Sequence, residues 1–337
     1  MKNILLLPML LISMSLMAQP AKWNKKKHFT IMSYNVENLF DTVAFNHSDD
    51  EFTPGSPKQW GTERYTRKLE NIAKVIASVH PEELPELVGM VELENIQVLS
   101  DLVKTPALQK ANYVPLLIEG PDPRGIDCGL IYRPDAFKYL SHKAIPVFFN
   151  GDSSRRTRDI LYVKGLVKKD TLHVFVNHWT SRRGGEDTET KRVQCAQALK
   201  KQVDSLLVIN PKSLVIIMGD FNDEPSDKSL HETLQASNLE ESGTLENLMY
   251  PLHTEGKGTY YFKGAYNMLD NMVISRAIKT KTKGFRLLHP SGMIFNPEMI
   301  SYTQKNGDKA PNRTFSGDKY FGGFSDHFPI YTIFYEK

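Results

Sequence analysis

The chain closes on the stretch GGFSDHFPIYTIFY (residues 322–335), in which Ser325-Asp326-His327 separates a glycine pair from an apolar run. The run from Phe328 to Tyr335 predicts a buried strand. A histidine at the entrance of such a strand is held in place, and it can act as a general acid or base near neutral pH. The carboxylate of Asp326 could set the tautomer of the imidazole or bind a metal ion. The triplet is therefore a candidate site around which the other polar clusters of the chain can be arranged.

Other predicted strands also end in polar side chains. The strand His28–Val36 presents Asn35, whose amide could contact a phosphate or a metal-bound water, or could simply cap a turn. The strand Leu87–Val91 looks fully buried and is followed by Glu92. A carboxylate near a core needs a partner, and a divalent cation is one. The alternative is an acid that begins the next helix, a role that suits Glu94 better than Glu92.

The strand Leu214–Met218 is the most apolar of the chain and leads into Asp220 and Asn222. Side chains two residues apart on an extended chain point to the same side. An acid and an amide at this spacing can hold an attacking water and stabilise charge, although an acidic turn before a proline is the alternative. Asp270, at the start of the predicted strand Leu269–Ser275, could orient a histidine from behind, as acids do in catalytic triads.

A basic loop follows His178, which itself ends a predicted strand. The loop contains Arg182 and Arg183, and arginine donors match the oxygens of a phosphate. The pattern favours an anionic substrate, and the alternative is a solvated loop that nearby acids partly neutralise. Arg313 lies in the long segment 290–324, which has few structural signals, and segments of this length are often functional. We assign all three arginines to substrate binding.

Composition limits the class of protein. The chain has 337 residues with 40% hydrophobic content, which suffices for a large core, and no change of composition divides it. These features favour a single domain over residues 28–337. The two cysteines, Cys128 and Cys195, exclude a disulfide scaffold. The formal net charge of +3 is too small to identify a nucleic-acid-binding protein by itself.

Residues 1–18 have the pattern of a secretory signal peptide, with Lys2 before a short apolar run and Ala18 at the expected cleavage site. We expect export to the periplasm or the exterior, with residues 19–27 left as a mobile basic lead-in. The apolar run is short for a membrane span. The mature protein is therefore expected to have no stable membrane span, and a retained N-terminal anchor is the alternative.

Hydrophobic periodicity predicts the remaining elements. They are helices over 63–79 and 188–208, strands over 113–118, 127–132 and 144–149, a hairpin of 160–167 with 172–177, a strand pair of 258–263 with 269–275, and a surface loop over 41–61.

Six stretches, taken in order, resemble the endonuclease/exonuclease/phosphatase superfamily, which includes pancreatic-type deoxyribonuclease, abasic-site endonucleases, inositol-polyphosphate phosphatases and bacterial sphingomyelinases. The stretches are SYNVENLF (33–40), VGMVELEN (88–95), NHWTSRRGG (177–185), MGDFNDEP (218–225), LDNMVIS (269–275) and SDHFPI (325–330). The resemblance implies an α+β fold, a four-layer α/β/β/α sandwich in which two mostly antiparallel sheets are flanked by helices. The site is expected at one edge of the sheets.

The resemblance also implies a role for each polar residue. The catalytic set would be His178, Asp220, Asn222, Asp270 and His327, and the metal-binding set Asn35, Glu92 and Asp326. Oxygen ligands favour a hard cation, so Mg²⁺ is expected first, with Mn²⁺ or Ca²⁺ as alternatives. The general base is open between His327 and Asp220, and so is the number of metal ions.

The sequence thus predicts an exported, metal-dependent phosphodiesterase, which we expect to act as an endonuclease on DNA or RNA and to be a monomer. A second hypothesis is a phosphatase or phospholipase-type phosphodiesterase that acts on inositol phosphates or phospholipid headgroups. The third is a surface-binding protein without enzymatic activity, which the complete set of competent side chains makes least attractive.

Overall fold

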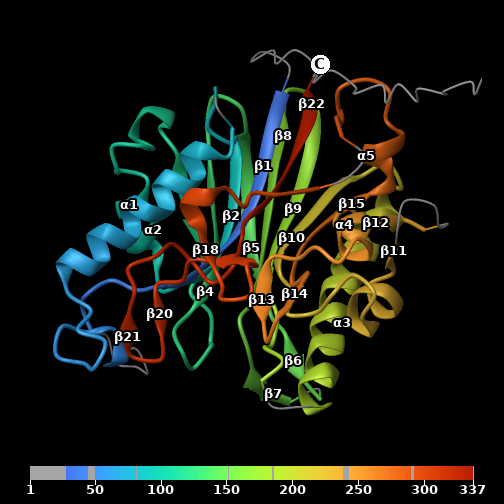
Figure 1. The fold of residues 1–337 in the computed structure, drawn as a ribbon. Helices are drawn as coiled ribbons and strands as arrows, with labels where there is room; N and C mark the ends of the chain where they lie inside the picture. Colours follow the sequence, from blue (N-terminus) through green and yellow to red (C-terminus); the bar gives the residue numbers. More distant parts are fainter. Residues whose placement is uncertain are drawn as a thin grey trace, which may run out of the picture.

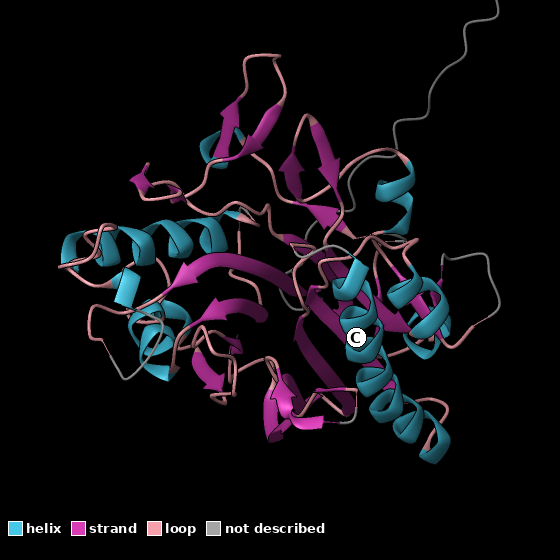
Figure 2. Cartoon of the chain, turned by 90° about the horizontal axis from the view of Figure 1, so that it is seen from below, coloured by secondary structure: helices cyan, strands magenta, loops and turns pink. Residues whose placement is uncertain are grey.

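The computed structural model describes residues 28–44, 50–80, 82–150, 152–183, 186–237, 243–289 and 292–336. The predicted signal peptide and basic lead-in lie outside these residues. Two seven-stranded sheets form the centre of the molecule. Helices cover both flanks of the strands, as Figures 1 and 2 show. The predicted four-layer sandwich is confirmed.

The first sheet places strands from both ends of the chain side by side. Strand β1 pairs in parallel with β2 and antiparallel with β22, and β1 and β22 are the blue and red strands of Figure 1. In spatial order the sheet consists of β16 (Phe285–Leu287), β22 (Ile330–Glu336), β1 (His28–Leu39), β2 (Leu87–Leu93), β4 (Asp127–Tyr132) and β3 (Val114–Leu117), and β17 (Met293–Ile294) also pairs with β22.

The second sheet is built around the apolar strand β10, which pairs in parallel with β9 and antiparallel with β15. In spatial order it consists of β11 (Ala236–Ser237), β12 (Leu245–Asn247), β15 (Asp270–Ser275), β10 (Leu214–Asp220), β9 (Asp170–His178), β8 (Ile160–Val167) and β5 (Lys138–Ile145). Antiparallel pairs outnumber parallel ones in both sheets, as predicted.

Side chains alternate between two cores along each strand. In β1, Phe29 and Ile31 pack between the sheets, whereas Met32 and Tyr34 face helices on the outer side. This is the alternation that the sequence predicts for a strand buried on both faces. The outer helices are α1 (Thr62–Ser78) and α2 (Ile96–Leu102) on the first sheet and α3 (Glu186–Ile209) on the second, with the short α4 (Tyr250–Thr254) and α5 (Arg276–Thr280) near its edge.

The described part of the chain also forms four small hairpins outside the two sheets. One of them corrects a prediction, because β13 pairs with β14 and not with the strand 269–275, which lies between β10 and β12. Local turn chemistry therefore decided the partner of β13. The hairpins are β6 (Phe148–Phe149) with β7 (Asp152–Arg156), β13 (Tyr260–Phe262) with β14 (Ala265–Asn267), β18 (Ser301–Thr303) with β19 (Lys309–Pro311), and β20 (Phe315–Ser316) with β21 (Lys319–Tyr320).

Two further expectations are corrected. The strand expected over 144–149 is divided between the end of β5, at Ile145, and the short β6. Strand β5 begins earlier than expected, at Lys138, and lies at an edge where most of its side chains meet solvent. Such a strand needs no apolar alternation, so periodicity missed it. The expected surface loop 41–61 is anchored by the fully buried Trp60, which packs with Phe40, Phe52 and Phe315 in a separate apolar cluster. None of the helices in the described residues is long and apolar enough to span a membrane.

Candidate active site

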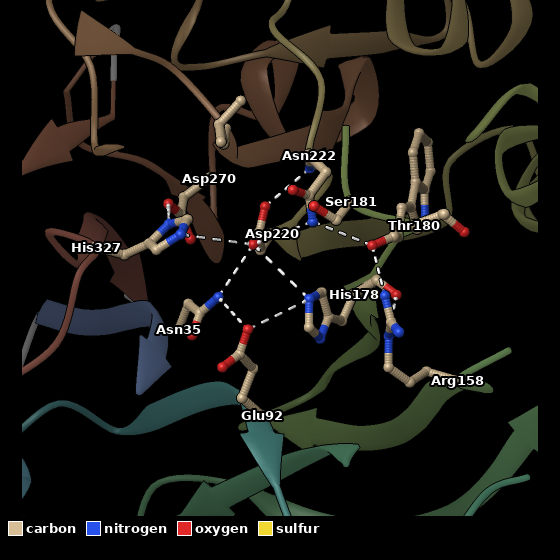
Figure 3. Close-up of polar contacts among 12 residues, drawn as sticks. Asn35, Glu92, Arg158, His178, Thr180, Ser181, Asp220, Asn222, Asp270 and His327 are labelled. Atoms are coloured by element: carbon tan, nitrogen blue, oxygen red, sulfur yellow. Dashed lines mark hydrogen bonds and ion pairs between the residues drawn. The ribbon is translucent and has the colours of Figure 1, made fainter. Parts of the chain in front are cut away.

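The strand register brings polar side chains to one edge of the two sheets. In the second sheet, Asp220 of β10 stands opposite His178 of β9 on one side and Asp270 of β15 on the other. In the first sheet, β1 and β2 run in parallel, so Asn35 and Glu92 both lie near their carboxyl ends. Side chains distant in sequence therefore meet at a single place, which Figure 3 shows.

The carboxylate of Asp220 is the centre of the cluster. Its Oδ2 accepts a hydrogen bond from Nδ2 of Asn35 at 3.0 Å, and the same nitrogen lies 3.3 Å from Oε1 of Glu92. Nε2 of His178 and Nε2 of His327 each lie 3.8 Å from this oxygen of Asp220. A carboxylate, an amide and two imidazoles thus converge on one point (Figure 3).

His327 is fixed from behind. Its Nδ1 lies 2.7 Å from Oδ2 of Asp270, and its backbone N–H donates to the hydroxyl of Ser325. The Ser325 hydroxyl donates in turn to the backbone carbonyl of Asn35 at 2.6 Å. The Asp270 contact orients the imidazole so that Nε2 faces Asp220, which is the arrangement expected of a supporting acid.

The two histidines are in opposite electrostatic environments. Burial lowers the pKa of His178 well below its ordinary value, and the cations Arg158 and Arg124 lower it further. Burial also opposes charge on His327, but the carboxylates of Asp270 and Asp220 outweigh it and raise the pKa of His327 well above its ordinary value. The same cluster therefore disfavours charge on His178 and favours it on His327. Such divergence within one site is typical of an acid–base assembly.

The backbone is strained at several of these positions. Glu92, Asn222 and Glu37, which lies two residues after Asn35, adopt φ angles of 67°, 51° and 53°, in the left-handed region that residues other than glycine rarely occupy. Gly219 has a φ of 137°, and a Cβ there would lie 1.9 Å from the carbonyl oxygen of Asn177, so only glycine fits before Asp220. Strain of this kind collects at functional sites, where surrounding structure maintains it.

Asn222 is held by its neighbours in the direction of the cluster. Its backbone N–H donates to Oδ1 of Asp220 at 2.8 Å, and its Nδ2 donates to the carbonyl of Trp179 at 3.1 Å. Nδ2 also lies 3.3 Å from Oδ2 of Asp220. The predicted acid–amide pair is therefore in contact, with both side chains buried.

The arginines assigned to substrate binding are not equivalent. The guanidinium of Arg182 donates to the carbonyl of Asn222 at 2.8 Å and pairs with Asp227, so it helps to hold the loop of Asn222. Its assignment to substrate binding stays a prediction. Arg183 is exposed, and Arg313 lies 3.7 Å from the carboxylate of Asp326.

Two buried cations near the site were not identified from the sequence. Arg158 is buried and donates to Asp122 and to the carbonyls of His178 and Trp179. Its role is therefore to support the loop of His178.

The second buried cation is Lys68 of α1. It is fully buried and donates to the hydroxyl of Thr314 at 2.5 Å and to the carbonyl of Phe324 at 2.8 Å. The only signal in the sequence is that Lys68 lies on the apolar stripe of α1, where Ile72 and Val75 follow at helical spacing.

A hard divalent cation needs several oxygen donors that face one point. Within the described ranges, no group of three or more His, Cys, Asp or Glu side chains forms a ready metal site. However, the carboxylates of Glu92 and Asp220 approach the same amide of Asn35, which concentrates negative charge from oxygen atoms. A hard divalent cation that keeps several waters suits such an open set of oxygen donors. The residues present therefore fit an open Mg²⁺ site better than a closed one.

Comparisons with known proteins agree with this architecture. A model of the Endonuclease/Exonuclease/phosphatase family matches residues 30–337. Solved structures with a similar fold include a protein of that family from Bacteroides thetaiotaomicron (TM-score 0.57, 15% identity, covering 92% of this chain and 98% of that one). Truncated Caenorhabditis elegans TDP2 is similar at a TM-score of 0.56 and 14% identity, over 91% and 98% of the two chains.

The catalytic domain of human Nocturnin, solved with a bound sulfate, has a TM-score of 0.53 and 16% identity, over 92% and 95% of the two chains. No curated protein sequence matches this chain. The likeness to the solved structures concerns the fold, whereas the family model extends over nearly all of the described residues. The chain belongs to the endonuclease/exonuclease/phosphatase family.

Proposed function

We propose that this protein is a metal-dependent phosphodiesterase that acts as an endonuclease on nucleic acid. The observation that carries the proposal is the convergence on Asp220, whose Oδ2 lies 3.8 Å from Nε2 of both His178 and His327 and 3.0 Å from the amide of Asn35. Donors from three separate segments of the chain thus surround one carboxylate. Donors that are already in place at this point could also stabilise the negative charge that develops on a phosphate bound next to Asp220.

The chemistry of a phosphodiester assigns work to these groups. The substrate is already anionic, so attack by water requires neutralised charge, a positioned nucleophile and a protonated leaving oxygen. Asp220 and Asn222 would orient the water, and Asp220 would accept its proton. His178 and His327 would donate from Nε2 to phosphate oxygens, with His327 held by Asp270. Of the two candidates for the general base, Asp220 and His327, we therefore assign the role to Asp220.

A bound Mg²⁺ would polarise the phosphoryl oxygen and offset the developing negative charge. Glu92 and Asn35 would hold it, since they lie together at the ends of β2 and β1 with their side chains 3.3 Å apart. Asp326, whose carboxylate lies 3.7 Å from Arg313, would be a further ligand of the metal ion. Mn²⁺ and Ca²⁺ are also oxygen-seeking and remain alternatives.

Nucleic acid is the proposed substrate because the fold is shared with proteins of that activity class. D. rerio TDP2, which is similar to this chain at a TM-score of 0.54 and 16% identity, was solved with a single-strand DNA product. Arg183, which is exposed, and Arg313, which is half-buried beside Asp326, would contact phosphates. We also propose that the protein is a monomer, and that it is exported after cleavage near Ala18. N-terminal sequencing of the protein recovered from cell fractions would test the export.

The decisive experiment incubates the purified protein with plasmid DNA, RNA and inositol and lipid phosphates, each with Mg²⁺ or with chelator. We expect nicking of nucleic acid that needs Mg²⁺ and that His327→Ala abolishes. His142→Ala, at the edge strand β5, is the matched control and should nick normally. Intact nucleic acid together with release of phosphate or a headgroup would move the protein to the phosphatase or phospholipase class.

A further inference from the structure

A row of aromatic rings leads outward from the catalytic histidine. The ring of Tyr260 lies 4.9 Å from the imidazole of His327 at an interplanar angle of 37°. The ring of Phe262 follows at 6.3 Å from Tyr260 and is nearly parallel to it, at 22°. Tyr260 and Phe262 alternate along β13 and therefore share one face of the strand. The row begins at the reacting centre and ends in solvent.

The hairpin that carries the row is joined to the catalytic pair at its base. The hydroxyl of Thr259 accepts a hydrogen bond from the backbone N–H of Asp270 at 3.2 Å. The carbonyl of Thr259 accepts one from the backbone N–H of Phe328 at 2.8 Å. Tyr260 and His327 also form an antiparallel bridge. The distance from the row to the imidazole is thus set by backbone contacts. In Figure 1 the hairpin β13–β14 lies at the centre of the molecule, between the two helical flanks.

The opposite face of the hairpin is braced by a second hairpin. The hydroxyl of Tyr261 donates to Asp308 at 2.6 Å and accepts from Nδ2 of Asn306 at 3.1 Å. The ring of Tyr266 on β14 packs edge-on against Tyr261 at 5.1 Å. Because Tyr261 is tied to the loop of β18–β19, the face with Tyr260 and Phe262 is held in one orientation.

The outer end of the row combines an exposed ring with a positive charge. Phe262 is 54% exposed, and the amine of Lys263 lies over its ring at 5.2 Å from the centroid. An exposed ring that is held in one orientation loses little conformational freedom when a ligand stacks on it. Planar apolar faces next to a cation suit a ligand that has both flat rings and negative charge.

We propose that Tyr260 and Phe262 form a stacking platform for the bases of single-stranded nucleic acid that flank the scissile phosphate. This inference rests on the proposed nuclease function and specifies its substrate. A single strand can turn its bases onto aromatic side chains, whereas the bases of a duplex are already stacked on one another. The platform starts at His327, so a phosphate beside that imidazole would place the neighbouring base over Tyr260 and the next over Phe262. Lys263 would meet the backbone.

The test compares two single-stranded oligonucleotides of one length, one complete and one with abasic units at the positions that flank the cleavage site. Both have the same phosphates, so they differ only in the bases that could stack. We expect Phe262→Ala to lower kcat/KM on the complete strand by about 5- to 100-fold, the range for one lost stacking contact. On the abasic strand the loss should be much smaller, and Phe262→Trp should restore cleavage of the complete strand.

The matched control is Phe321→Ala, which removes a ring that is 50% exposed and has Lys319 over it at 5.0 Å, but on another hairpin. It should leave the ratio between the two strands as in the wild type. A binding measurement avoids catalysis altogether. With chelator present, the tryptophan emission that Phe262→Trp adds to that of the wild type, which has three tryptophans, should be quenched by the complete strand and not by the abasic one.

Three outcomes would overturn the platform. The first is an equal loss on both strands in Phe262→Ala, which would indicate a structural role for the ring. The second is unaltered cleavage in Phe262→Ala with reduced sedimentation on phosphatidylglycerol vesicles, which would assign the hairpin to a lipid surface. The third is quenching by both strands. A wild-type protein that hydrolyses other phosphodiesters but neither strand would refute the nuclease proposal itself.

Discussion

Strand β2 has a glutamate at each end, and the two ends differ in what surrounds the carboxylate. Glu86, just before the strand, accepts the backbone N–H of Thr30 at 2.6 Å and pairs with Arg133 at 3.3 Å. Glu92, near the other end, accepts the backbone N–H of Asn38 at 2.9 Å and faces Nε2 of His178 at 3.7 Å. The first carboxylate is satisfied by its neighbours, whereas the second faces a cluster of titratable groups.

A shifted pKa does not by itself separate these two regions. Burial raises the pKa of Glu86 to about 7, with the N–H of Thr30 and the charge of Arg133 opposing the shift. Burial raises the pKa of Asp220 as well, at the site edge. The difference lies in the partners, because Asp220 faces two imidazoles and an amide that three separate segments of the chain deliver. Convergence of functional groups, and not burial of a charge, therefore distinguishes a site from a structural contact.

The largest effect is expected when the carboxylate of the site is changed to an amide, and the same kind of change at Glu86 serves as the comparison. Asp220→Asn keeps the shape of the side chain but removes the proton acceptor, so kcat/KM for Mg²⁺-dependent nicking should fall by about 10³-fold or more. Glu86→Gln should stay within about twofold of the wild type, because nothing in its surroundings touches the reaction. Steady-state kinetics on both variants, with folding verified by circular dichroism, would decide. Comparable losses in the two variants would contradict the distinction between the edges.

The core of the fold could be predicted because buried strands have a local signature. The runs that became β1, β2, β4, β8, β9 and β10 are rich in apolar residues and mostly buried, and β1, β2, β9 and β10 have polar residues near their carboxyl ends. The edge strand β5 has no such run, since solvent covers most of its side chains. The partner of β13 was also missed, because pairing depends on the two-residue turn at Lys263 and Gly264.

The sequence also predicted only part of the candidate site. The structure brings Asn35, Glu92, His178, Asp220, Asn222, Asp270 and His327 together, as their placement at strand ends suggested, and their roles stay predictions. Arg158 and Lys68 were missed because their partners are remote in sequence. Lys68 contacts Thr314, which is 246 residues away, and Arg158 contacts Asp122 from another loop. A cation's burial depends on such partners, which a single sequence does not reveal.

The second prediction concerns stability at the Glu86 edge. The carboxyl of Glu86 has a pKa of about 7 in the folded protein, against an ordinary value of 4.5, so the folded state binds this proton more tightly than the unfolded state. Its contribution to stability is fully present below about pH 4.5 and is lost as the pH rises through 7. The groups that face it are Arg133, Glu83 and the N–H of Thr30.

Glu86→Gln removes this titration, so the variant should gain stability relative to the wild type as the pH rises from 5 to 8, by about 1–3 kcal/mol at the upper end. Urea unfolding at both pH values measures the difference. Glu189→Gln, on the exposed face of α3, is the matched control and should show none. A variant that is less stable at pH 8 than at pH 5, relative to the wild type, would show that the pair with Arg133 outweighs burial.

The smallest effect is expected from the two arginines beside the site, which the structure separates into support and contact. Arg182 holds the carbonyl of Asn222, so Arg182→Ala should loosen the water-positioning amide and lower kcat by about 10-fold with little change in KM. Arg183 is exposed and would contact only the phosphate backbone, so Arg183→Ala should raise KM and weaken the salt dependence of binding. If Arg182→Ala instead raised KM alone, its guanidinium would have to leave Asn222 and Asp227 to bind substrate. The edge of the site would then be less preorganised than these contacts indicate.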